Sequence, residues 1–82
     1  MKLSLVTPDK AVYEGEVQRV QLPGSNGSFE VLENHAALIS SLDKGNVKIT
    51  SDSGVENFII DGGVVEVNNN KVIVLAESLL EA

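Results

Sequence analysis

The sequence has no cysteine and no tryptophan, and only one histidine occurs among its 82 residues. Without cysteine, the chain has no disulfide framework, no thiolate nucleophile and no zinc–thiolate site. Long apolar runs are absent as well, because no segment approaches the roughly 18 consecutive apolar residues that a membrane-spanning helix requires. Residues 1–5 alternate like a strand and lack the apolar centre of a signal peptide. We therefore expect a soluble chain in the cytoplasm.

Positive charge is also scarce. Lysine and arginine together number 6, against 12 aspartates and glutamates, so the formal net charge is −6. The basic residues are scattered along the chain, at Lys2, Lys10, Arg19, Lys44, Lys48 and Lys71. Proteins that bind nucleic acids or anionic membranes need such charges clustered, and oligonucleotide-binding barrels add aromatic side chains for base stacking. With 2 phenylalanines and 1 tyrosine, we expect no nucleic-acid binding and no direct membrane insertion.

Motifs for catalysis and cofactor binding are missing too. His35 would need carboxylates alone to complete a metal site, and no ligand spacing supports one. No G-x-S-x-G elbow surrounds a serine, and residues 24–27 lack the Lys-Ser/Thr pair of a phosphate-binding loop. The sequence therefore predicts a protein that is not an enzyme, with no catalytic residue, no metal and no cofactor.

The chain does contain a series of short segments rich in valine, isoleucine and leucine, which favour strands. Strong turn signals separate these segments, at residues 7–10, 23–27, 43–46, 51–54, 61–63 and 68–70. The Asn26-Gly27 pair favours a type I′ hairpin turn. Turn signals at this spacing predict one all-β domain, built as a sandwich or a barrel.

One stretch departs from this pattern. Residues at helical spacing follow Asn34, which is a suitable N-cap: His35, Leu38, Ile39 and Leu42. Local pattern alone therefore predicts a short helix there.

Three expected strands are apolar on both faces, at residues 58–60, 64–65 and 72–75. One face of each strand belongs to the core. The other is covered by a partner or by another part of the chain, or it is left exposed as ordinary isolated aliphatics. Only Leu79 and Leu80 remain in the chain to cover it. The sequence leaves these interpretations open.

Three blocks in this order and spacing resemble the amino-terminal domain of the epsilon subunit of the rotary F-type ATP synthase. They are residues 5–17, residues 23–39 with the motif Asn34-His35-Ala36, and residues 62–77 with Gly62-Gly63-Val64. The likeness implies a flattened β-sandwich of about ten short strands over residues 1–77. Residues 78–82 would form a short tail, without the family's usual C-terminal helical hairpin. It also implies that residues 34–42 are largely extended.

The resemblance implies a central-stalk rotor subunit that has no catalytic activity. Such a subunit binds the gamma subunit and the c-ring, and it couples the transport of hydrogen ions or another ion to ATP synthesis. It is associated with the inner face of the cell membrane through the ATP synthase complex. In the family the helical hairpin inhibits ATP hydrolysis and, in some members, binds ATP, so we expect neither hairpin-type inhibition nor ATP binding in this chain.

The resemblance also assigns partner-binding residues. The residues expected to face the c-ring are Gly27, Ser28, Phe29 and Glu30. The residues expected to face gamma are Thr7, His35, Ala36, Leu38, Ser40, Asp61 and Gly62. The sequence departs from the family where Glu33 and Ala37 replace usual prolines around the Asn-His-Ala motif, which frees the backbone of that loop.

A carrier domain is the alternative from another functional class. Asp9-Lys10-Ala11 resembles the attachment tripeptide of lipoyl- and biotinyl-carrying domains, which are also acidic, all-β and of similar size. This alternative makes Lys10 the attachment site. In that family, however, the lysine lies near the middle of two quasi-symmetric halves, whereas Lys10 follows only the first expected strand.

Overall fold

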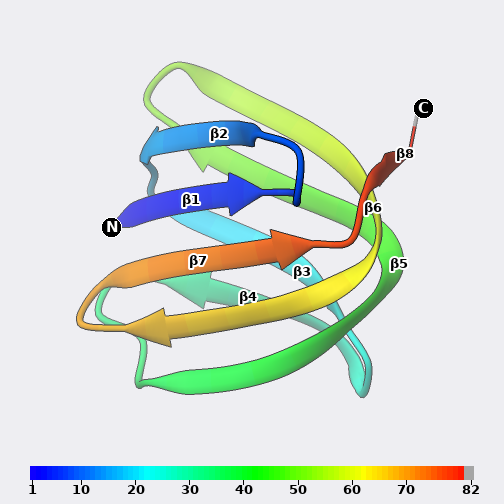
Figure 1. Cartoon of the computed structure of the whole chain (residues 1–82). Helices are drawn as coiled ribbons and strands as arrows, with labels where there is room; N and C mark the ends of the chain where they lie inside the picture. Colours follow the sequence, from blue (N-terminus) through cyan, green and yellow to red (C-terminus); the bar gives the residue numbers. More distant parts are fainter. Residues whose placement is uncertain (81–82) are drawn as a thin grey trace.

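The computed structural model describes residues 1–80, which form an all-β fold (Figure 1). The expected all-β class is confirmed, with eight strands in place of about ten. The strands are β1 (Lys2–Val6), β2 (Ala11–Glu16), β3 (Arg19–Gly24), β4 (Gly27–Leu32), β5 (Leu38–Ser51), β6 (Gly54–Asn68), β7 (Lys71–Ala76) and β8 (Leu79–Leu80). Among residues 1–80 there is no helix of the length and hydropathy that crossing a membrane requires.

The strands form one sheet that folds over itself. Their order is β2-β1-β7-β6-β5-β3-β4, with β8 beside β6, and only the β1–β7 pair is parallel. Strands β5 and β6 have 14 and 15 residues and run through both layers of the sandwich (Figure 1). Residues 38–42 and 63–68 of these strands lie beside β7, β1 and β2, whereas residues 44–51 and 54–61 lie beside β3 and β4. Two long, bent strands thus replace four short ones, which accounts for the smaller number.

The core lies between the two layers and consists of aliphatic side chains. In the layer that contains β7, Val65 and Val67 of β6 are buried, whereas Ile60 is buried in the other layer. The inward-facing positions therefore change from even to odd numbers along β6. This change occurs at Gly63, whose φ is 154°. A Cβ atom at Gly63 would lie 2.2 Å from the carbonyl oxygen of Leu75, so only glycine fits this close approach.

The turn chemistry differs from the sequence prediction at one hairpin. Ser25 and Asn26 connect β3 to β4 without a positive φ at either residue, so the type I′ turn expected at Asn26-Gly27 is wrong. A type I′ turn needs positive φ at both central residues. That condition is met between β6 and β7, where Asn69 and Asn70 have φ of 51° and 61°.

The stretch with helical spacing is not a helix. Asn34 has a φ of 61° and ends a turn closed by the His35 N–H, which donates to the Leu32 carbonyl at 3.2 Å. Strand β5 then begins at Leu38, as the extended conformation implied by the resemblance requires. Tertiary strand pairing with β6 has overridden the local helical pattern.

The expected tail contributes to the sheet. Leu79 and Leu80 form β8, which pairs with Ile60 and Ile59 of β6. The expected boundary between domain and tail therefore falls beside a strand of the same sheet. Residues 81–82, the end of that tail, lie outside the described residues.

Candidate partner-binding surfaces

The outward face of the β5–β6–β7 layer carries a patch of aliphatic side chains, which we call the apolar face. It consists of Ile39, Val64, Ile73 and Leu75, whose side chains are 73%, 40%, 39% and 54% exposed. Val64 pairs with Leu75 across the sheet, and Glu66 lies between Ile39 and Ile73 in the next row. Residues 64–65 and 72–75 are therefore apolar on both faces, as the sequence indicated, whereas residues 58–60 add no side chain to the apolar face. Because β8 pairs at Ile59–Ile60, it leaves this face uncovered.

The outward face of the other layer, the polar face, has different chemistry. Its exposed residues are Arg19, Gln21, Ser28, Glu30, Asn46, Lys48 and Asn57, with Leu32 and Val55 at its margins. Several of these side chains bond to one another. Gln21 donates from Nε2 to Ser28 Oγ at 3.3 Å, and Asn46 donates from Nδ2 to Asn57 Oδ1 at 2.9 Å. Some of the hydrogen-bonding groups of this face are therefore satisfied by its own side chains.

Four of the residues expected to bind gamma lie together where β5 begins: His35, Ala36, Leu38 and Ser40. His35 is half-buried, and its Nδ1 donates to the Ala36 carbonyl at 2.7 Å, which fixes the ring close to the backbone. The backbone N–H of Asn34 donates to Asn70 Oδ1 at 2.8 Å. A polar hollow lined by asparagines 68–70 therefore adjoins this group.

The other three residues expected to bind gamma lie at the far end of the same layer. Strand β7 runs from the Asn70 turn, beside the first group, to Ala76, and Val6 pairs with Leu75 near that end (Figure 1). Thr7 follows Val6 directly. Asp61 donates its N–H to the Ser78 carbonyl at 3.1 Å, and Gly62 accepts from the Glu77 N–H at 3.0 Å. The predicted gamma set thus splits into two groups, with the apolar face between them.

The four residues expected to face the c-ring lie on β4. Phe29 is half-buried and packs against the core, whereas Ser28 and Glu30 are exposed on the polar face. The turn before β4 is fixed to β5, because the Ser25 N–H donates to the Ser41 carbonyl at 3.0 Å. The Ser25 hydroxyl donates to Asp43 Oδ1 at 3.0 Å. The exposed polar members of the set therefore lie on a hairpin whose turn is hydrogen-bonded to β5.

The structure offers little geometry for a metal or a carried group. Within residues 1–80, no cluster of three or more His, Cys, Asp or Glu side chains could hold a metal ion. Lys10 is exposed on the turn between β1 and β2, where its carbonyl accepts from the Thr7 N–H at 2.9 Å. No observation favours Lys10 as an attachment site over a solvated turn lysine.

The α-amino group of Met1 joins three segments of the chain. Its nitrogen lies 3.0 Å from Glu33 Oε1, 3.2 Å from Glu16 Oε2 and 3.3 Å from the Val17 carbonyl oxygen. The hydrogen bond to Glu33 raises the pKa of this amine, burial opposes the rise, and Glu16 adds to it. Glu33 thus occupies a position at which the resembled family has proline. Here its carboxylate binds the amino group that precedes β1.

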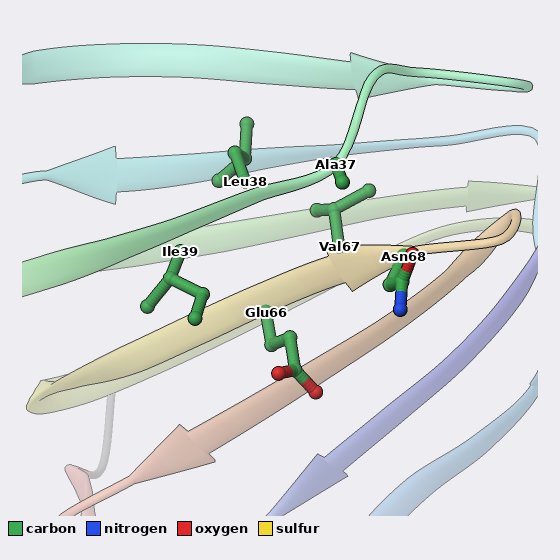
Figure 2. Close-up of a pocket in the computed structure, with 6 residues that line it drawn as sticks. All are labelled: Ala37, Leu38, Ile39, Glu66, Val67 and Asn68. Carbon is green, nitrogen blue, oxygen red and sulfur yellow. The ribbon is translucent and has the colours of Figure 1, made fainter.

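The sequence did not identify one further feature of this surface. Figure 2 shows a hollow at the start of β5, lined by Ala37, Leu38, Ile39, Glu66, Val67 and Asn68. Ile39 and Glu66 point to the outward side of the sheet, and Leu38 and Val67 point to the core side. The spacing of apolar residues in the sequence predicted that Ile39 lies on the apolar face of a helix. Only the pairing with β6 shows that its side chain is outward.

Comparisons with known proteins all lead to one family. The family model described as "ATP synthase, Delta/Epsilon chain, beta-sandwich domain" matches residues 1–82. The ATP synthase epsilon chain of Chlorobium limicola is 42% identical over 79 residues, which cover 95% of this chain and 90% of that relative. The epsilon chain of Sulfurimonas denitrificans is 46% identical over 78 residues, which cover 94% of this chain but only 60% of the relative.

Two solved structures share the fold. A chain in the central stalk and c-ring of the Tetrahymena thermophila mitochondrial ATP synthase matches with a TM-score of 0.83 at 24% identity, covering 98% of this chain and 65% of that one. A chain in the Euglena gracilis mitochondrial ATP synthase matches with a TM-score of 0.88 at 21% identity, covering 95% of this chain and 51% of that one. At these identities the likeness concerns the fold alone.

Proposed function

Because the chain belongs to the family of ATP synthase delta/epsilon-chain β-sandwich domains, we propose that it is an epsilon-type subunit of the ATP synthase rotor. In this role it binds the gamma subunit and the c-ring and joins them, so that ion-driven rotation reaches the catalytic head. The observation that carries the proposal is the match to the Chlorobium limicola epsilon chain, at 42% identity over 95% of this chain and 90% of the relative.

The contribution of this subunit is binding rather than catalysis. A group of exposed aliphatic side chains is typical of a protein–protein contact, and Val64, Ile73 and Leu75 form such a group on neighbouring strands. Through its partners the subunit is held in the membrane-associated complex, on the inner face of the cell membrane. Its own surface needs no lipid contact for this.

The gamma subunit binds across the apolar face and the two groups at its ends. Protein interfaces commonly have an apolar centre and a polar rim. Ile73 and Leu75 provide the centre here. His35 at one end and Asp61 at the other provide polar groups for the rim. The c-ring binds elsewhere, at Ser28 and Glu30 on the β3–β4 hairpin.

A calorimetric titration of the chain against isolated gamma subunit tests the proposal. We expect one-to-one binding that Leu75→Ser weakens about tenfold, because an exposed side chain at an interface centre contributes on the order of 1–2 kcal/mol. His35→Ala and Leu38→Ala should weaken binding as well. Lys48→Ser on the polar face is the matched control and should leave the affinity unchanged. No binding of the unmodified chain to correctly folded gamma would refute the proposal.

A further inference from the structure

The first residues of β5 form a free edge of the sandwich. Leu38 to Leu42 pair with β6 on one side along their whole length. On the other side, β3 reaches β5 only at Gly24, which pairs with Leu42, and at Ser25, which bonds to Ser41. Among the residues that the structure describes, no strand pairs with Leu38, Ile39 or Ser40 from that side. Exposed edges of this kind pair readily with another chain.

The backbone of Ile39 points into this open edge. Ser41 directs its carbonyl away from β6, because that carbonyl accepts the Ser25 N–H at 3.0 Å. Residues two apart in a strand direct their backbone groups to the same side. The N–H and C=O of Ile39 therefore face outward, whereas those of Leu38 and Ser40 face Val67 and Val65 of β6. A partner strand would find one donor and one acceptor at Ile39.

The side chains at the edge alternate in chemistry. Ile39 is 73% exposed, the largest exposure among the large apolar residues of residues 1–80, and it lies beside Glu66 on the outward side. Leu38 lies on the core side, at the mouth of the hollow (Figure 2). The residues lining the hollow include one carboxylate and no lysine or arginine. An added strand with alternating apolar and basic side chains would match this arrangement.

We propose that an extended segment of the gamma subunit pairs with β5 at Leu38–Ser40 as an additional strand. The inference rests on the function proposed above and concerns how that partner binds. An apolar side chain of the segment contacts Leu38 in the hollow, and a long lysine or arginine side chain reaches across Ile39 toward the Glu66 carboxylate. The edge continues directly into the apolar face through Ile39, so one partner contacts both surfaces. Main-chain hydrogen bonds give this mode its affinity, and the two side-chain positions give it specificity.

Two substitutions at one position separate backbone pairing from side-chain contact. Ile39→Ala and Ile39→Pro both remove the aliphatic side chain, but only proline removes the outward N–H. Sheets tolerate proline on an edge strand whose N–H faces solvent, so both variants should fold. We expect gamma to bind the proline variant about tenfold more weakly than the alanine variant, because the partner carbonyl is left unpaired. Glu66→Gln should weaken binding several-fold at low salt and less at high salt.

Hydrogen exchange gives a second measurement that needs no variant. In the free chain the Ile39 amide should exchange fast and the Ser40 amide, which faces β6, should exchange slowly. Added gamma should slow exchange of the Ile39 amide and leave exchange of the Ser40 amide unchanged.

If gamma binds the two Ile39 variants equally, or leaves the Ile39 amide unprotected, the edge is not used. The inference then fails while the rotor function stands. Failure of the unmodified chain to bind gamma overturns both. The chain could instead self-associate, and Ile39→Pro could abolish that self-association. This result would show that the edge pairs with a second copy of this chain, and it would overturn the inference.

Discussion

The two layers of the sandwich share strands β5 and β6 and one aliphatic core, yet their outward faces are opposite in chemistry. The layer with β3 and β4 exposes polar groups such as Gln21, Glu30 and Lys48. The layer with β7 exposes Ile73 and Leu75 on the same strand that buries Val72 and Val74. Burial in the core explains the aliphatic residues of only one face of β7.

This difference indicates which part of the surface is adapted to a partner. On the polar face, hydrogen bonds such as that between Asn46 and Asn57 hold side chains that water can also solvate. On the apolar face, exposed aliphatic area carries a cost of about 25 cal/mol per Å² relative to burial. A protein partner that covers Ile73 and Leu75 removes this cost, and the solvent cannot. Substitutions of buried residues should therefore change mainly the stability of the chain, and substitutions on the apolar face should change mainly its binding to a partner.

The largest expected effect lies at the glycine that divides β6 between the layers. Gly63→Ala should lower the free energy of unfolding by about 3 kcal/mol or more, because a Cβ would collide with the Leu75 carbonyl and the φ of 154° is unfavourable for alanine. Gly54 is the matched control: its φ is 120°, but a Cβ would meet no atom within 4 Å. Gly54→Ala carries the backbone strain without the collision and should cost about 1–2 kcal/mol. Urea unfolding of both variants measures the difference, and equal losses would show that the clash is absent.

The next effect contrasts the two faces of β7 at neighbouring positions. Val74→Ala should cost about 2 kcal/mol, since it removes buried methyl groups and leaves a cavity. Leu75→Ala removes more atoms but from an exposed side chain, so its cost should stay within about 0.5 kcal/mol. Binding to gamma should show the reverse order. If Leu75→Ala destabilises the chain as much as Val74→Ala, the apolar face is part of the core and the comparison fails.

A smaller contrast of the same kind occurs on β4. Phe29 is half-buried against the core, and Glu30 is exposed on the polar face. Phe29→Ala should cost about 1.5 kcal/mol, about half of a fully buried phenylalanine. Glu30→Ala should cost at most about 0.5 kcal/mol, even counting its ion pair with Arg19 at 4.0 Å. Retention on immobilised c-ring should fall for Glu30→Ala. Unchanged retention would remove Glu30 from the proposed ring contact.

Much of the fold could be predicted because the turns are encoded locally. The breaks near Pro8, Asp52 and Asn69 all lie between strands in the structure. The long strands could not be predicted, because Gly62 and Gly63 read as a turn but let β6 continue through a bend. Likewise Asn26-Gly27 reads as a type I′ turn, whereas the two residues between the paired strands are Ser25 and Asn26. The pairing register of the strands determines whether β6 continues and where the β3–β4 turn falls. This register depends on contacts between residues that are distant in sequence.

The candidate surfaces were predictable to a smaller degree. The continuous apolar run at residues 72–75 indicated that this strand has a second aliphatic row besides the one in the core. It could not show that this row joins Ile39, because Ile39 reaches it only through the pairing of β5 with β6. The sequence also could not show that the side chain of Phe29 faces inward, because this depends on how β4 pairs with β3. The resemblance assigned residues to gamma and to the c-ring but did not give their positions in space. Only the sheet topology shows that the residues assigned to gamma lie at both ends of one face.

The smallest expected effect depends on pH and occurs where the two layers are tied together. The Met1 ammonium links Glu16, in the layer with the apolar face, to Glu33, which follows β4 of the other layer. The Glu33 hydrogen bond holds the pKa of this amine above its ordinary value, against the opposing effect of burial and with help from Glu16. A raised pKa in the folded state means that this link stabilises the chain fully below the unfolded pKa of about 8 and is lost as pH rises through the folded value.

Thermal unfolding of the chain and of a Glu16→Gln/Glu33→Gln variant, from pH 7 to pH 10 in roughly half-unit steps, tests this pH dependence. The advantage of the unmodified chain should be present at neutral pH and shrink as the solution becomes alkaline. An advantage that stays constant over that range would show that the two glutamates act on stability without the ammonium.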